Sequence, residues 1–81
     1  MKKLNAFNEA NEREIEMMVG KAMCAWANWQ TALDNPYSKD IQIAYKNEYE
    51  ATICCIDMFV KDGLYAIQDY VTGRAKAEFG I

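Results

Sequence analysis

The residues best suited to contact a ligand are aromatic and basic side chains near the C-terminus of the chain. All five tyrosines follow the single proline, Pro36. Tyrosine offers an aromatic face and a hydroxyl group and is enriched at interfaces, and an aromatic ring beside Arg or Lys can stack on a nucleobase while the cation holds its phosphate. Core aromatics with solvated hydroxyl groups are the alternative interpretation. The predicted ligand- or partner-binding set is Tyr65, Gln68, Tyr70, Arg74 and Lys76.

The residue types that most catalytic and metal sites need are absent or scarce. The chain has no histidine, so it lacks the commonest general base and metal ligand. Its three cysteines, Cys24, Cys54 and Cys55, do not have the spacing of a zinc site, and its four glycines form no phosphate-binding loop. We therefore expect a protein that is not an enzyme and that uses no metal and no cofactor.

Length, charge and hydropathy narrow the class of protein. The 81 residues make one domain, and domains of this size often gain stability by forming oligomers. The net charge of −3 argues against direct nucleic-acid binding, which needs a dense basic face. The longest apolar stretch, 17–33, is interrupted by polar residues, and the N-terminus has no apolar signal sequence. We expect a cytoplasmic protein that does not insert into a membrane.

The hydrophobic pattern predicts a first helix over about 9–33, followed by a turn over 34–39. Apolar residues recur there with heptad spacing, which places both tryptophans on one face of the helix. The predicted stripe is Ile15, Val19, Ala22, Trp26, Trp29 and Leu33. The tryptophans are therefore expected to hold the second helix near the turn.

A second stripe, on the opposite side of the first helix, consists mostly of small residues. Small side chains let another helix approach closely, and Gly and Cys are poor choices for an exposed helix surface. A plain solvent-exposed face is the alternative. We predict an oligomer interface formed by Met17, Gly20, Cys24, Ala27 and Thr31.

After the turn, the apolar rhythm predicts a long second helix over about 40–72 and a frayed tail over 73–81. Around 51–60 this helix is apolar on almost every side, so it needs more than one neighbouring helix. The favoured fold is an all-α helical hairpin, assembled into an oligomer, with its long helix continuous through Gly63 or bent or broken there. The alternative is a three-helix bundle in which Gly63 ends the second helix. We favour the hairpin because no capping residue follows Gly63.

The segment "KDGLYAIQDYV", Lys61–Val71, resembles the signature helix of phage helical-hairpin proteins that sequester cyclic nucleotides from the host's CBASS defence. The agreeing positions are Gly63, Leu64, Ala66, Ile67 and Val71, whereas Tyr65 and Asp69 depart from the pattern of that family. The resemblance implies a phage or mobile-element anti-defence factor that binds a small anionic ligand such as a cyclic nucleotide.

Together these features predict a non-enzymatic, self-associating helical protein that acts by sequestering or occluding a partner. The expected partners are a second copy of the chain and either a nucleotide-like small molecule or a host protein. The alternative function is that of a protein-directed inhibitor or a structural interaction module that binds no small ligand.

Overall fold

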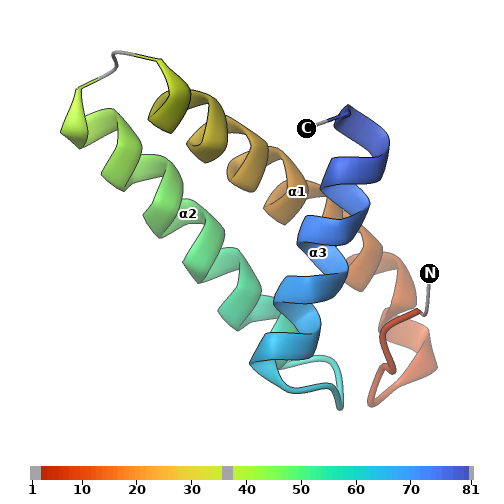
Figure 1. Cartoon of the computed structure of the whole chain (residues 1–81). Helices are drawn as coiled ribbons and strands as arrows, with labels where there is room; N and C mark the ends of the chain where they lie inside the picture. The colour runs from red at the N-terminus through yellow and green to blue at the C-terminus, as the bar shows by residue number, and fades with distance from the viewer. Residues whose placement is uncertain (1–2, 36–37, 81) are drawn as a thin grey trace.

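The chain folds into three α-helices preceded by a single 3₁₀ turn (Figure 1), in a computed structural model that describes residues 3–35 and 38–80. The elements are η1 (Glu9–Asn11), α1 (Glu12–Asp34), α2 (Lys39–Asp57) and α3 (Leu64–Phe79). The predicted all-α class is confirmed. None of the helices within the described residues is long and apolar enough to cross a membrane.

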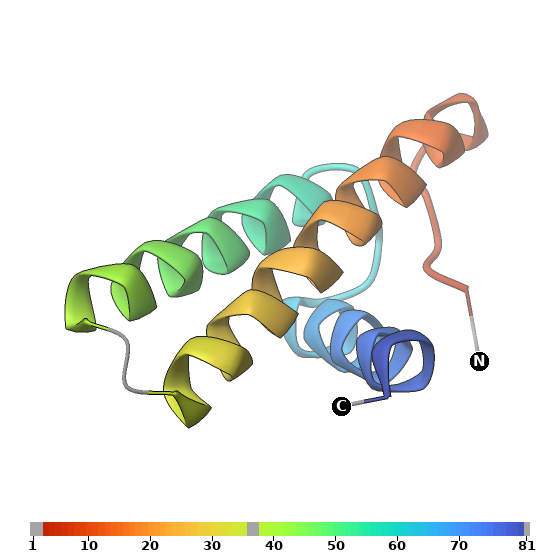
Figure 2. The ribbon, with the colours of Figure 1, turned by 90° about the horizontal axis from the view of Figure 1, so that it is seen from above.

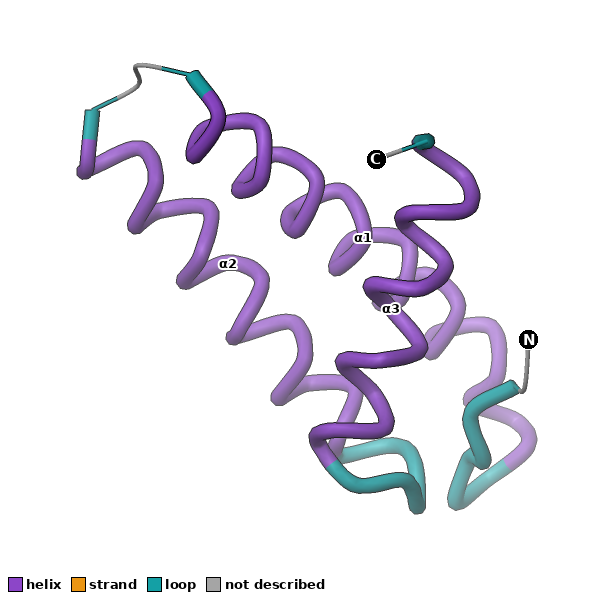
Figure 3. The backbone as a smooth tube through the Cα atoms, in the orientation of Figure 1, coloured by secondary structure: helices purple, strands orange, loops and turns teal. Residues whose placement is uncertain are grey.

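Helices α1 and α2 form an antiparallel hairpin, and α3 packs across one face of it. Figure 2 shows α3 beneath the layer formed by the other two helices. Helices α2 and α3 leave a common loop and diverge along their length (Figure 3). The hairpin turn falls where it was predicted: α1 ends at Asp34, and Ser38 caps α2 by accepting a hydrogen bond from the Ile41 backbone N–H at 3.4 Å. Residues 36 and 37 of that turn lie outside the described residues.

The favoured long helix over 40–72 is not continuous: α2 ends at Asp57 and α3 begins at Leu64, so the structure has the break that the sequence left open at Gly63, and it has three helices as in the alternative. The N-terminal segment pairs with the loop between them, through an antiparallel bridge that joins Ala6 to Val60. The Phe7 N–H donates to the Phe59 carbonyl at 3.0 Å, and the Lys61 N–H donates to the Asn5 carbonyl at 2.7 Å. Backbone groups that leave the helix therefore find partners more than fifty positions away in the sequence.

The start of α3 explains why no capping residue follows Gly63. Gly63 is itself the N-cap, in an extended conformation with φ −75° and ψ 168°. Glycine is among the residues that N-cap positions prefer. The preceding Asp62 is tied to the N-terminal segment, since its carboxylate accepts hydrogen bonds from the Asn5 backbone N–H at 2.7 Å and from Asn5 Nδ2 at 3.3 Å.

The predicted tail over 73–81 is helical through Phe79, so the expected fraying after Gly73 is wrong for the described residues. Ala75 is fully buried, which anchors this part of α3 against the rest of the chain. The helix ends at Gly80, whose φ of 68° lies in the left-handed region that glycine adopts without strain. The Gly80 N–H donates to the Lys76 carbonyl at 3.0 Å.

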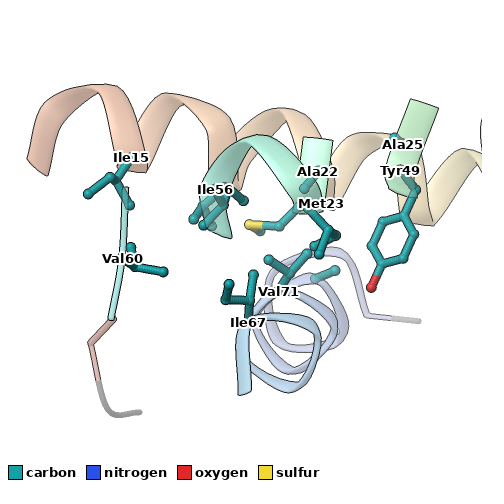
Figure 4. Close-up of a cluster of buried hydrophobic side chains, with 12 residues drawn as sticks. Ile15, Ala22, Met23, Ala25, Tyr49, Ile56, Val60, Ile67 and Val71 are labelled. Atoms are coloured by element: carbon teal, nitrogen blue, oxygen red, sulfur yellow. The ribbon is translucent and has the colours of Figure 1, made fainter. Parts of the chain in front are cut away.

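All three helices and the α2–α3 loop contribute to one hydrophobic core (Figure 4). The buried cluster is Ile15, Val19, Ala22, Met23, Ala25, Tyr49, Ile53, Ile56, Val60, Ile67, Val71 and Ala75. The first half of the predicted α1 stripe is buried as expected, and Trp26 and Trp29 pack against the cluster while remaining partly exposed. Leu33 is 50% exposed, so the stripe does not stay buried to the end of α1.

Candidate binding groove

The five residues predicted to bind a ligand all lie on α3, but they do not form one site. Tyr65 is 85% exposed, and Gln68 lines a groove between the helices. Tyr70 and Arg74 contact each other. Lys76 lies over the ring of Trp26. Their spacing places these residues on different faces of α3, so their side chains contact different parts of the fold.

Arg74 is engaged by carboxylates rather than free to bind an anion. Its Nη1 donates to both carboxylate oxygens of Glu16 on α1, at 3.1 and 3.0 Å, and its Nη2 donates to Glu78 at 3.2 Å. Nη1 also donates to the Tyr70 hydroxyl at 3.1 Å, and the guanidinium lies 5.5 Å from the Tyr70 ring centroid. The hydrogen bond with Glu16 is the main cause that raises the pKa of Arg74. This cluster clamps α3 to α1.

A groove with a cavity volume of about 460 Å³ is lined by residues of all three helices. This volume falls within the range of roughly 300–1,000 Å³ that is typical of small-molecule sites. Two of its lining residues come from α1, four from α2 and four from α3. They are Trp26, Trp29, Tyr49, Glu50, Ile53, Cys54, Leu64, Gln68, Asp69 and Thr72.

Three aromatic residues, Trp26, Trp29 and Tyr49, line the groove. The ring centroids of Trp29 and Tyr49 are 5.9 Å apart, with an angle of 37° between the ring planes. Figure 4 shows the Tyr49 side chain extending from α2 toward the level of α3, with its hydroxyl group at the far end. On the third ring, that of Trp26, Lys76 Nζ lies 6.0 Å from the centroid. Trp26, a residue that lines the groove, thus already contacts the ammonium group of Lys76.

The charged residues that line the groove are acidic. Burial is the main cause that raises the pKa of Tyr49, and the negative charges of Asp69 and Glu50 raise it further, in that order. The Asp69 carboxylate on α3 and the Glu50 carboxylate on α2 therefore both disfavour ionisation of the Tyr49 hydroxyl. Glu50 has one long ion pair, 3.8 Å from Lys46, with both side chains more than half exposed. Such an exposed pair contributes little to stability, so another cation can replace Lys46 beside Glu50 at small cost.

The sequence pattern did not identify Glu50, Cys54 and Asp69 as groove residues. Periodicity assigns residues to faces of single helices, and these three face a space that exists only once three helices are packed. The one available signal was Asp69, an acidic residue within the tyrosine-rich stretch 65–70. The tryptophans were assigned to the helix contact alone, whereas each also lines the groove.

The predicted oligomer interface on α1 is not covered by α2 or α3. Met17 is 70% exposed, and a Cβ atom built on Gly20 would meet no heavy atom within 4 Å. Cys24 and Thr31 are exposed, and Ala27 is partly so. The Thr31 hydroxyl donates to the Ala27 carbonyl at 2.9 Å. The stripe is therefore open to a neighbour, and its role as an oligomer interface stays a prediction.

The three cysteines are free and exposed, and each lies in a different setting. Cys54 lines the groove. The adjacent Cys55 lines a separate depression of about 230 Å³ between α1 and α2, together with Met18 and Glu48. Cys24 lies on the open face of α1. Cys54 and Cys55 thus offer neighbouring positions inside and outside the groove.

Across residues 3–35 and 38–80, no group of three or more Cys, Asp or Glu side chains is arranged to hold a metal ion. Comparisons of the chain with protein-family models, with curated proteins and with solved structures each gave no match.

Proposed function

We propose that this chain is a non-enzymatic binding protein that takes a small ligand into the groove between its three helices and thereby sequesters it. The observation that carries the proposal is the groove itself, with its volume of about 460 Å³, three aromatic walls and polar side chains from α2 and α3. An apolar cavity with a few convergent polar groups is the usual form of a small-molecule site. The absence of histidine from the sequence supports binding without catalysis.

Self-association is part of the same proposal. It is supported by the open small-residue stripe on α1 and by apolar side chains that stay exposed elsewhere, among them Phe7, Met58 and Tyr65. Small domains that expose such side chains often bury them by assembling. A cytoplasmic location remains a prediction from the sequence.

The cyclic nucleotide implied by the family resemblance also remains a prediction, and it receives less support from the geometry. A phosphate needs a cation that is free to approach it. Lys76 lies over Trp26 and makes no ion pair among the described residues, but Arg74 already holds Glu16 and Glu78, and two carboxylates line the groove. Nucleotides therefore belong in the ligand screen as one class among several.

The test is a thermal-shift screen with cationic, neutral and anionic small molecules, including cyclic nucleotides. A ligand at 100 times its Kd should stabilise the protein by about 2.7 kcal/mol. Hits are then titrated by tryptophan fluorescence, because both tryptophans line the groove.

Two neighbouring substitutions locate the site. Cys54→Trp should fill the groove and abolish binding, whereas Cys55→Trp, one residue away and outside the groove, should leave binding intact. A screen without any hit, or a hit that binds the Cys54→Trp variant as tightly as the unmodified protein, would refute the proposal.

A further inference from the structure

The groove combines aromatic side chains with two carboxylates, one of which pairs with Lys46 at 3.8 Å, and the Lys76 ammonium lies beside its Trp26 wall. Trp26, Trp29 and Tyr49 supply the rings, and Glu50 and Asp69 supply the carboxylates. We propose that the groove selects a small organic cation, in which an alkylated ammonium group is carried on an apolar body. This inference rests on the proposed ligand-binding function and names the chemical class of its ligand.

The aromatic walls favour a positive charge because the face of an aromatic ring carries negative electrostatic potential. Significant cation–π contacts place the cation within about 6 Å of the ring centroid, and tryptophan is the best partner. The ammonium group of Lys76 lies 6.0 Å from the centroid of Trp26. A tethered ammonium is therefore already held by a ring that lines the groove.

The two carboxylates that line the groove also favour a cation, whereas the Lys76 ammonium beside Trp26 opposes it. Asp69 makes no ion pair among the described residues, and the pair between Glu50 and Lys46 is long and exposed. The strongest cation on α3, Arg74, is held by carboxylates from α1 and α3. A ligand cation would thus meet two available carboxylates near Tyr49.

The aromatic walls also distinguish an organic cation from a metal ion. A hard metal ion needs several oxygen ligands around it, whereas a methylated ammonium is weakly hydrated and gains from contact with rings. The apolar side chains of Ile53 and Leu64 in the same lining suit the body of such a molecule.

Choline and its neutral carbon analogue 3,3-dimethyl-1-butanol provide a matched pair of probes, with adenosine monophosphate as the anionic probe. Titrations followed by tryptophan fluorescence should give a Kd for choline about 5- to 30-fold lower than that for the neutral analogue, which is the range expected for a partly desolvated cation–π and carboxylate site. Adenosine monophosphate should bind more weakly than choline.

Substitutions then assign the preference to the groove. Glu50→Gln and Asp69→Asn should each weaken choline binding about 3- to 10-fold and leave binding of the neutral analogue unchanged. Glu48→Gln, on the same helix but outside the groove, is the control and should change neither. Lys76→Gln should strengthen choline binding, because it removes a positive charge from the rim, whereas an anion site would respond in the opposite way.

Equal affinity for choline and the neutral analogue would overturn the inference and leave the proposed binding function standing. Tighter binding of adenosine monophosphate, or weaker choline binding by the Lys76→Gln variant, would overturn it in the same way. If none of the three probes binds, the inference fails, and the wider ligand screen alone decides whether the proposed function fails with it.

Discussion

Substitution of Gly63 distinguishes the three-helix fold from a continuous second helix. In the structure Gly63 is the N-cap of α3, at φ −75° and ψ 168°, which any L-residue adopts without strain. A Cβ atom added there would meet no heavy atom within 4 Å. Alanine and serine therefore both fit, and the two variants differ only by a hydroxyl group.

The two folds predict opposite orders of stability for the Gly63→Ser and Gly63→Ala variants. At an N-cap, a serine hydroxyl accepts a hydrogen bond from the first turn of the helix, and serine is more favourable than alanine by about 1 kcal/mol. Inside a helix, alanine is more favourable than serine by roughly 0.5 kcal/mol. Both substitutions remove the same backbone freedom of glycine from the unfolded chain, so that effect nearly cancels in the comparison.

Urea unfolding followed by far-ultraviolet circular dichroism measures this difference. We expect the Gly63→Ser variant to be more stable than the Gly63→Ala variant by about 1 kcal/mol, and its Tm to be higher by about 4–8 °C in a domain of this size. The reasoning is refuted if the alanine variant is the more stable of the two, since that order belongs to a helix interior.

Three further predictions concern the core, the open face of α1 and the titration of Tyr49. Ile67→Ala should lower the free energy of unfolding by about 2–5 kcal/mol, because Ile67 is fully buried between the helices; a loss below 1 kcal/mol in urea unfolding would contradict its position. Gly20→Leu should change the oligomeric state measured by light scattering while the monomer still folds, because a Cβ atom built at this position meets no heavy atom within 4 Å; an unchanged assembly would argue against an interface at this stripe. The pKa of Tyr49 is raised, so the folded state holds the phenol proton more tightly than the unfolded state does. The contribution of this group to the free energy of unfolding should therefore be fully present below pH 10, the ordinary tyrosine value. It should be lost as the pH rises through the folded-state pKa. Tyr49→Phe should flatten that fall in unfolding measurements between pH 9 and about 11.5, and an identical fall in the variant would show that other groups cause it.

Local pattern was sufficient for the helical class, for the extent of α1 and for the inner face of α1. The heptad spacing predicted the burial of Ile15, Val19 and Ala22, and the turn before Ser38 followed from the only cluster of helix-breaking residues. Such features depend on residues within about one or two helical turns, and sequence periodicity reports on residues at that separation.

The candidate site was predicted less well than the helices. Of the five α3 residues proposed to bind a ligand, Gln68 lines the groove and Lys76 reaches its Trp26 wall, while Arg74 and Tyr70 join a clamp with Glu16. The partners of each side chain come from other helices, so the spacing along α3 alone did not separate these roles.

The sequence by itself determined that this chain is helical, that α1 packs through one apolar face and that no histidine is available for catalysis or metal binding. Only the tertiary structure decided where α2 stops and what lies between the helices. The apolar rhythm runs on through 58–63, but the helix breaks there, and the Asn5 carbonyl and the Phe7 N–H supply backbone partners to the loop on either side of the Ala6–Val60 bridge. The break lets α3 cross the hairpin and diverge from α2, so that residues of three separate helices line one groove.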